Sequence, residues 1–232
     1  RQLRESKNAR RRLVLTDGVF SMDGDIAPLD EVCELCETYD AMLYVDDAHG
    51  EGVMGEGGRG IVDHFNLQGR VDFEAGTFSK AFGVVGGLVA GAEEVRLHAL
   101  NHSRTWLLSA SHPPGVAAAQ KASIEVLEQE PQHHKRLWIV TNHIRKALQD
   151  LGFDTGSSVT PIIPIMCGSS ERARSFSDEL YKKGVLALPI VFPMVAKDKA
   201  RVRCMMNAGL SDEDMNQIID TMSTAGRSVG LI

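Results

Sequence analysis

The stretch VDFEAGTFSKAFGVVGGLVAG, residues 71–91, carries a single lysine at its centre, Lys80. An apolar run with Val71, Phe73 and Ala75 comes before it, and a glycine-rich apolar segment after it predicts a further strand. A lysine between two strands is either a surface residue of a turn or a partly buried amine. Burial lowers the pKa of such an amine and produces the neutral form that attacks carbonyl groups.

Upstream of this stretch, an apolar strand at residues 42–45 runs directly into the sequence DDAHG. Strands alternate with helices at a spacing that indicates βαβ units and a mostly parallel sheet, so the fold class is α/β. In such sheets functional residues collect at the carboxyl ends of the strands, where Asp46 and His49 fall. A carboxylate at this position is also common as a helix cap, which is the alternative for Asp46.

The remaining elements follow from periodicity and from glycine and proline positions. Helices are expected at the start of the chain as far as Arg12, at 28–40, 93–103 and 114–128, after 131, and at 170–183 and 211–225. Strands are expected at 13–16, 106–108, 161–166, 185–189 and 201–206. The break at Glu130-Pro131 predicts a domain boundary, with a large domain over residues 1–130 and a small α+β domain over 131–232.

Composition excludes several classes of protein. The 232 residues include 43% hydrophobic and 24% charged residues, which is ordinary for a globular protein. A net charge of −6 argues against a broad nucleic-acid surface, and no apolar run is long enough to cross a membrane. We therefore expect no nucleic-acid and no membrane partner.

Cysteines suggest a reduced compartment and no metal. Cys33 and Cys36 form a CxxC, but it lies in one amphipathic helix, of which Val32, Leu35 and Cys36 are expected to face inward. No second pair completes a zinc set, so no metal site is expected. A cytoplasmic location fits this cysteine usage, and a mitochondrial one is possible for a eukaryotic source.

Five motifs occur together in a fixed order: DGVFSMDGD (17–25), VDDAHGEG (45–52), GTFSKAFGVVGG (76–87), SRTWLLSASHPP (103–114) and ARVR (200–203). On these motifs the chain resembles the α-oxoamine synthases. These are fold-type I pyridoxal-phosphate enzymes that condense an amino acid with an acyl-CoA. Within the family it resembles glycine C-acetyltransferase most, through TDGVFSMDG and IIPIM.

The resemblance implies a role for each motif residue around pyridoxal 5'-phosphate. Lys80 is implied to bind the cofactor as a Schiff base and to move the proton at the α-carbon, and Asp46 to pair with the pyridinium nitrogen. Hydrogen bonds to the ring hydroxyl are implied for His49 and Ser21, and phosphate contacts for Thr77 and, from the neighbouring subunit of a homodimer, Ser109 or Ser111.

The same resemblance implies a binding residue for the substrate carboxylate. Arg203 is expected to hold that carboxylate through a two-pronged ion pair. Arg201 is the second candidate, because alternate residues of a strand share a face. Without the resemblance, ARVR would be an edge strand with exposed arginines.

The implied reaction joins glycine and acetyl-CoA to give 2-amino-3-oxobutanoate and free CoA. Three alternatives stay open. A longer acyl-CoA would be used, as in 8-amino-7-oxononanoate synthase or serine palmitoyltransferase. An aminotransferase would release a keto acid, and a non-catalytic relative would serve as an interaction subunit. Family members also carry more than a hundred residues before the position of Arg1, so an incomplete and inactive fragment is a further expectation.

Overall fold

The computed structural model describes all residues, 1–232, and internal contacts divide them into two compact units. Unit 1 contains Arg1–Val19 and Ile26–Pro131, and unit 2 contains Phe20–Asp25 and Gln132–Ile232. The short segment Phe20–Asp25 therefore groups with the C-terminal part of the chain, although the residues on both sides of it belong to unit 1.

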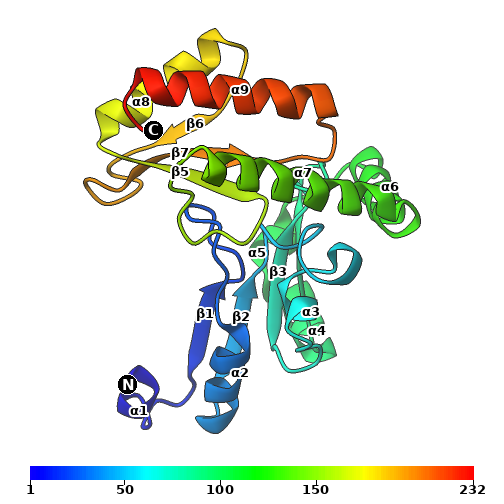
Figure 1. Cartoon of the computed structure of the whole chain (residues 1–232). Coiled ribbons are helices and arrows are strands. Elements are labelled where there is room, and N and C mark those ends of the chain that lie inside the picture. Colours follow the sequence, from blue (N-terminus) through cyan, green and yellow to red (C-terminus); the bar gives the residue numbers. More distant parts are fainter. The chain divides into compact units, whose positions relative to one another are not determined.

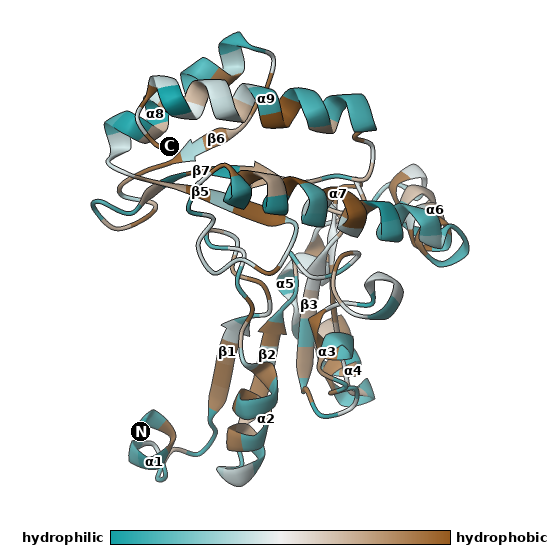
Figure 2. Ribbon diagram, in the orientation of Figure 1, coloured by the Kyte–Doolittle hydropathy of each residue, from teal (hydrophilic) through white to brown (hydrophobic).

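Unit 1 is built on a four-stranded sheet with the order β1-β2-β3-β4. Figure 1 labels the first three of these strands, which lie side by side. The first three strands are parallel, as expected, and β4 runs antiparallel to β3. Figure 2 shows β1 and β2 mainly in the colours of apolar residues. The elements of this unit are α1 (Gln2–Glu5), β1 (Leu13–Asp17), α2 (Leu29–Thr38), β2 (Met42–Asp46), a 3-10 turn (Glu56–Gly58), α3 (Ile61–His64), β3 (Phe73–Thr77), β4 (Gly87–Gly91), α4 (Glu93–His102), α5 (Arg104–Leu108) and α6 (Pro114–Gln129).

Helix α2 packs against β2 through one apolar stripe. Leu29, Cys33 and Cys36 are all buried, at the spacing of four and three residues that places side chains on one helix face. Leu35 was expected on this face but is 50% exposed, because the stripe passes through Cys33 rather than through Leu35. All four cysteines are buried and unpaired.

Unit 2 pairs three antiparallel strands, in the order β5-β7-β6, with helices on one face of the sheet. Side chains from alternate strand positions, such as Ile163, Ile165 and Val202, form one buried core with residues of the three helices. The elements are α7 (Pro131–Asp150), which begins at the last residue of unit 1, and β5 (Ile162–Gly168), α8 (Ser170–Lys182), β6 (Leu188–Ile190), β7 (Ala200–Met205) and α9 (Asp212–Ser228).

Three expected elements differ from the structure. The strand expected at residues 185–189 begins later, as β6 at Leu188–Ile190, and residues 185–187 are irregular. The strand expected at residues 106–108 is instead the helix α5, with Trp106, Leu107 and Leu108 all exposed. A run of three apolar residues is too short to distinguish a strand from a helix. The opening helix is only one turn, α1, because none of its residues is buried against the sheet.

None of the helices combines the length and the apolar character required to cross a lipid bilayer.

Candidate active site

The strand ends of unit 1 bring three parts of the chain to one edge of the sheet. Asp17, the last residue of β1, lies beside Asp46, the last residue of β2. Asp46 in turn lies beside Ala75 of β3, two residues before that strand ends at Thr77. Because the three strands are parallel, their carboxyl ends and the segments that follow them share this edge.

Lys80 interacts electrostatically with the carboxylate of Asp17. Partial burial raises the pKa of Asp17, the neighbouring Asp46 carboxylate raises it further, and the Lys80 ammonium opposes both. Two carboxylates and one amine therefore interact at the sheet edge. The sequence prediction selected Lys80 and Asp46 but missed Asp17, although Asp17 follows an apolar strand and opens the motif DGVFSMDGD.

The turn that follows β3 carries Lys80. Phe78, which is buried, anchors this turn: its N–H donates to Gly86 O at 3.0 Å, and its carbonyl accepts from Val84 N at 2.8 Å. Lys80 is exposed, so of the two alternatives drawn from the sequence the structure shows the surface residue of a turn and not the partly buried amine. Lys80 lies three residues after Thr77, the last residue of β3 that pairs with β4. The sheet therefore does not bury its side chain.

A pair of hydroxyl groups lies just before Lys80. The Oγ1 of Thr77 and the Oγ of Ser79 are 2.7 Å apart, and the backbone N–H of Ser79 donates to Thr77 Oγ1 at 3.2 Å. The Thr77 hydroxyl also lies 3.1 Å from its acceptor Gly86 O, and Ser79 is exposed, so a rotation of these hydroxyls would let them donate to an anion. Thr77 was expected from the sequence, whereas Ser79 was missed although it stands directly before the lysine.

Asp46 uses only one of its two carboxylate oxygens within the protein. Its Oδ1 accepts a hydrogen bond from the Ala48 N–H at 3.0 Å, the local contact that the capping alternative anticipates. The second oxygen makes no hydrogen bond to the protein and the side chain is exposed. His49 follows on the same turn and is half-buried. Asp46 can therefore stabilise the turn and still bind a ligand.

Behind the exposed carboxylates lies a buried carboxyl group that the sequence prediction did not use. Asp47 is completely buried, and its Oδ2 accepts the N–H of Ile61 at 2.8 Å. Burial raises the pKa of Asp47 to about 8, with a contribution from Glu74, and burial raises that of Glu51 to about 7. Burial therefore favours the protonated form of both carboxyl groups, and of Asp47 more than of Glu51.

Ser109 and Ser111 lie together after α5. The backbone N–H of Ser111 donates to Ser109 Oγ at 3.3 Å, and both Ala110 and Ser111 have positive φ angles, of 60° and 63°. Both serines are exposed. Their side chains are available to a ligand or to another subunit.

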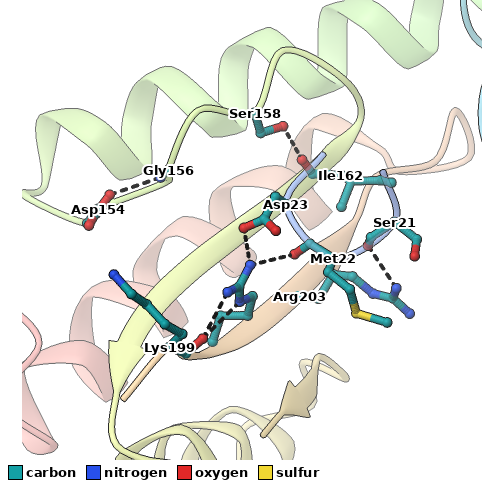
Figure 3. A network of polar contacts seen from close by, with 10 residues as sticks. Ser21, Met22, Asp23, Asp154, Gly156, Ser158, Ile162, Lys199 and Arg203 are labelled. Carbon is teal, nitrogen blue, oxygen red and sulfur yellow. Dashed lines mark hydrogen bonds and ion pairs between the residues drawn. The ribbon is translucent and has the colours of Figure 1, made fainter. Parts of the chain in front are cut away.

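In unit 2 the two arginines of β7 both contact the segment Phe20–Asp25 (Figure 3). Arg203 donates from Nη1 to the carbonyl of Ser21 at 2.9 Å, and its remaining nitrogens have no acceptor in the protein. Arg201 is buried, and all its nitrogens donate to protein groups, including the carboxylate of Asp23. The structure thus brings Ser21 and Arg203 together and leaves only Arg203 with free donors.

Comparisons with known proteins give a consistent result. The sequence model of the family described as "Aminotransferase class I and II" matches residues 1–222. The chain is 50% identical over 223 residues to the 8-amino-7-oxononanoate synthase of Symbiobacterium thermophilum, covering 96% of this chain and 57% of that protein. It is 47% identical over 232 residues to 8-amino-7-oxononanoate synthase 1 of Bacillus subtilis, covering 100% of this chain and 59% of that one.

Among solved structures, a serine palmitoyltransferase described as containing the PLP internal aldimine superposes with a TM-score of 0.92. The identity is 30%, and the match covers 99% of this chain and 59% of that one. The chain therefore spans less than two thirds of the length of the relatives it matches.

Proposed function

Since the chain belongs to the aminotransferase class I and II family, we propose that the protein containing it is a pyridoxal-phosphate-dependent α-oxoamine synthase. The expected resemblance to α-oxoamine synthases, the fold-type I fold and the cofactor expected for that family are confirmed by the relatives named above. The activity of the whole protein, its substrates and its partners are our proposal. The observation that carries the chemistry is the grouping of Lys80 with two carboxylates at the carboxyl edge of the sheet.

The donor set in unit 1 fits pyridoxal phosphate. An amine suits its aldehyde, a carboxylate with a free oxygen suits its ring nitrogen, and the hydroxyl pair of Thr77 and Ser79 suits its phosphate. When bound, the cofactor supplies a cationic ring that withdraws electrons from the α-carbon of an amino acid. The residues of this chain then have to hold that ring, orient the amino acid and move one proton.

We assign these tasks to the residues selected from the sequence. Asp46 holds the ring nitrogen in its protonated form, and Lys80 anchors the cofactor and removes the proton from the α-carbon. Arg203 orients the amino-acid carboxylate with the donors that Ser21 leaves free. The ring hydroxyl is assigned to His49 and Ser21, and the phosphate to Thr77 and, across a homodimer, Ser109 or Ser111.

The overall reaction forms a carbon–carbon bond between the α-carbon of the amino acid and the acyl carbon of the thioester. The carbon–sulfur bond of the thioester breaks, CoA leaves as the free thiol, and the amino-acid carboxylate departs as CO₂ where the product lacks it. No oxidant or reductant is required.

For the substrates, the relatives favour the longer acyl-CoA over acetyl-CoA. Two relatives with 47–50% identity over nearly the whole chain are named 8-amino-7-oxononanoate synthase. The nonanoate in this name has nine carbons, with an amino group at carbon 8 and a ketone at carbon 7. Alanine and the thioester of a seven-carbon dicarboxylic acid give this product when CO₂ is lost. We propose this pair, and the prediction of glycine with acetyl-CoA has no support among these relatives.

The full-length protein loaded with pyridoxal phosphate tests this function. Borohydride reduction followed by peptide mapping should place the cofactor label on Lys80 alone, and Lys80→Ala should remove both label and turnover. Lys121→Ala, which changes an exposed lysine of α6 paired with Glu125, is the matched control. A label on another lysine would reject the assignment.

A panel of acyl-CoAs with glycine, alanine and serine then identifies the substrates by the release of free thiol. The greatest release is expected with alanine and the dicarboxylic thioester. Release of a keto acid without free thiol would identify an aminotransferase instead, and a full-length protein that binds no cofactor would identify a non-catalytic relative.

A further inference from the structure

The segment Phe20–Asp25 is attached to the sheet of unit 2 through its carbonyl groups. Ser21 O accepts from Arg203 Nη1 at 2.9 Å, and Met22 O accepts from Arg201 Nη1 at 3.1 Å. Gly24 O accepts from Thr160 Oγ1 at 2.9 Å and from Val159 N at 3.2 Å. The carbonyl groups of Ser21, Met22 and Gly24 are thus all held from outside the segment. Figure 3 shows the segment lying over β5 and β7.

Gly24 brings the segment close to the sheet. Its φ is +69°, and a Cβ atom there would lie 2.5 Å from both Ile162 O and Ser158 Oγ. No residue with a side chain fits this space. Gly24 therefore lies tightly against the start of β5, and the hydrogen bonds from Thr160 Oγ1 and Val159 N hold its carbonyl there.

Arg201 fixes the other half of the segment. Its side chain is only 5% exposed, and its guanidinium also donates from Nε and Nη2 to Lys199 O, at 3.1 and 2.9 Å. Its one anionic partner is the carboxylate of Asp23, which is 49% exposed. A buried guanidinium without a counter-charge is unfavourable, so Asp23 holds Arg201 and the segment together.

Arg203 lies two residues from Arg201 on the same strand and therefore on the same face of the sheet. Its guanidinium is oriented by the Ser21 carbonyl, and this leaves Nε and Nη2 free for an oxygen pair of a ligand. The direction in which Nε and Nη2 of Arg203 point depends on where Ser21 O lies. The position of Ser21 O depends in turn on Met22 and Asp23, which Arg201 holds.

We propose that Asp23 and Arg201 are positioning residues, which set the direction of the Arg203 guanidinium and the place of Ser21 by clamping Phe20–Asp25 to β7. This inference rests on the proposed function, in which Arg203 binds the carboxylate of the amino-acid substrate. Asp23 touches neither substrate nor cofactor in this role. It acts through Arg201 and the backbone of the segment.

The test uses the full-length enzyme loaded with pyridoxal phosphate and the variant Asp23→Asn. Misplacing a binding group by about 1 Å can cost about a hundredfold, so we expect KM for the amino acid to rise about tenfold or more. KM for the acyl-CoA and the absorbance of bound cofactor should stay unchanged. Asp150→Asn, which breaks the exposed pair with Lys146 on α7, is the matched control and should change none of these values.

A double-mutant cycle separates positioning from a general structural role. If Asp23 acts through Arg203, Asp23→Asn should raise KM no further when Arg203→Gln is already present. Multiplied effects of the two changes would overturn the proposal. An equal loss in kcat and in the affinity for both substrates, together with a lower thermal midpoint, would also overturn it.

Hydrogen exchange gives a measurement that does not depend on activity. In Asp23→Asn, amides of residues 20–25 should exchange faster than in the unchanged enzyme, while amides of α9 should not. Faster exchange with an unchanged KM for the amino acid would overturn the positioning role. Absence of turnover in the unchanged enzyme would instead reject the proposed function, while the exchange experiment would still test the clamp.

If Asp23→Asn does not fold, Asp23→Glu keeps the charge but lengthens the side chain by one methylene. We then expect an intact fold and a smaller increase in KM for the amino acid. An unchanged KM in this variant would count against the clamp.

Discussion

Asp46 and Asp47 are adjacent in the sequence but lie in opposite environments. Asp46 is exposed at the sheet edge with one free carboxylate oxygen, whereas Asp47 is completely buried against Ile61. Successive side chains at the end of a strand point to opposite sides, which separates the two carboxyl groups. The first is suited to binding a ligand and the second to holding the loop beneath it.

For Asp46, we predict a loss of rate without loss of cofactor. Asp46→Ala should leave a yellow protein, because Lys80, the residue that we propose to bind the cofactor, is unchanged. The variant should lower kcat by about a hundredfold or more because a well-placed charge is lost. Absorbance and turnover of the full-length enzyme measure both. Asp30→Ala on the exposed side of α2 should change neither, and a colourless Asp46→Ala protein would contradict the assignment.

For Asp47, we predict a pH-dependent stability. The pKa of about 8 in the folded protein is far above the ordinary value of an aspartate, so the folded state keeps a proton that the unfolded state releases. Stability should therefore fall as pH rises from about 4 to about 8, by up to about 1.4 kcal/mol per pH unit for this group.

Asp47→Asn should flatten this slope, because the amide does not ionise. Thermal unfolding of the full-length protein between pH 5 and pH 8.5, at roughly half-unit steps, measures it. Part of the slope should remain, since Glu51 has a raised pKa of about 7. Replacing the exposed Asp154 with Asn should leave the slope as it is, and an unaltered slope in Asp47→Asn would contradict the prediction.

Among the elements, α5 and α9 show when local sequence is informative. The strand expected at residues 106–108 is a helix, because three apolar residues carry no reliable period. Helix α9 follows its sequence closely: Ser211 and Asp214 form a capping box at its start, and Met215 and Met222 lie seven residues apart on its buried face. A long amphipathic pattern with a cap specifies a helix, whereas a short apolar run does not.

We predict that the cap of α9 contributes measurably to stability. Ser211→Ala removes the oxygen that accepts from Asp214 N at 3.1 Å and should cost about 1 kcal/mol, seen as a lower thermal midpoint. Thr224→Ala, an exposed hydroxyl in the same helix, should cost less, because alanine favours the helix interior. Equal costs would show that the cap contributes nothing beyond an ordinary surface hydroxyl.

For the whole molecule, burial of every cysteine predicts unreactive thiols. Burial raises the pKa of Cys33 and Cys36, that of Cys167 to about 11 and that of Cys204 to about 12, so little thiolate forms at neutral pH. In the native protein, iodoacetamide should label the four peptides slowly, and in denaturant it should label all of them. Rapid native labelling at Cys33 or Cys36 would indicate a reactive CxxC.

The sequence by itself determined the order of most strands and helices, the place of Lys80 after β3 and the carboxylate at the end of β2. These features depend on residue spacing within a few turns or one strand. It also pointed to Arg203 through a family motif, with Arg201 as a second candidate.

Only the tertiary structure decided which side chains meet. It brought Asp17 beside Asp46, buried Asp47, and paired Arg201 with Asp23, a residue 178 positions away in the chain. It therefore left Arg203 as the arginine with free donors. A hydrogen bond between distant segments depends on how the chain packs in three dimensions, and no local pattern of residues records that.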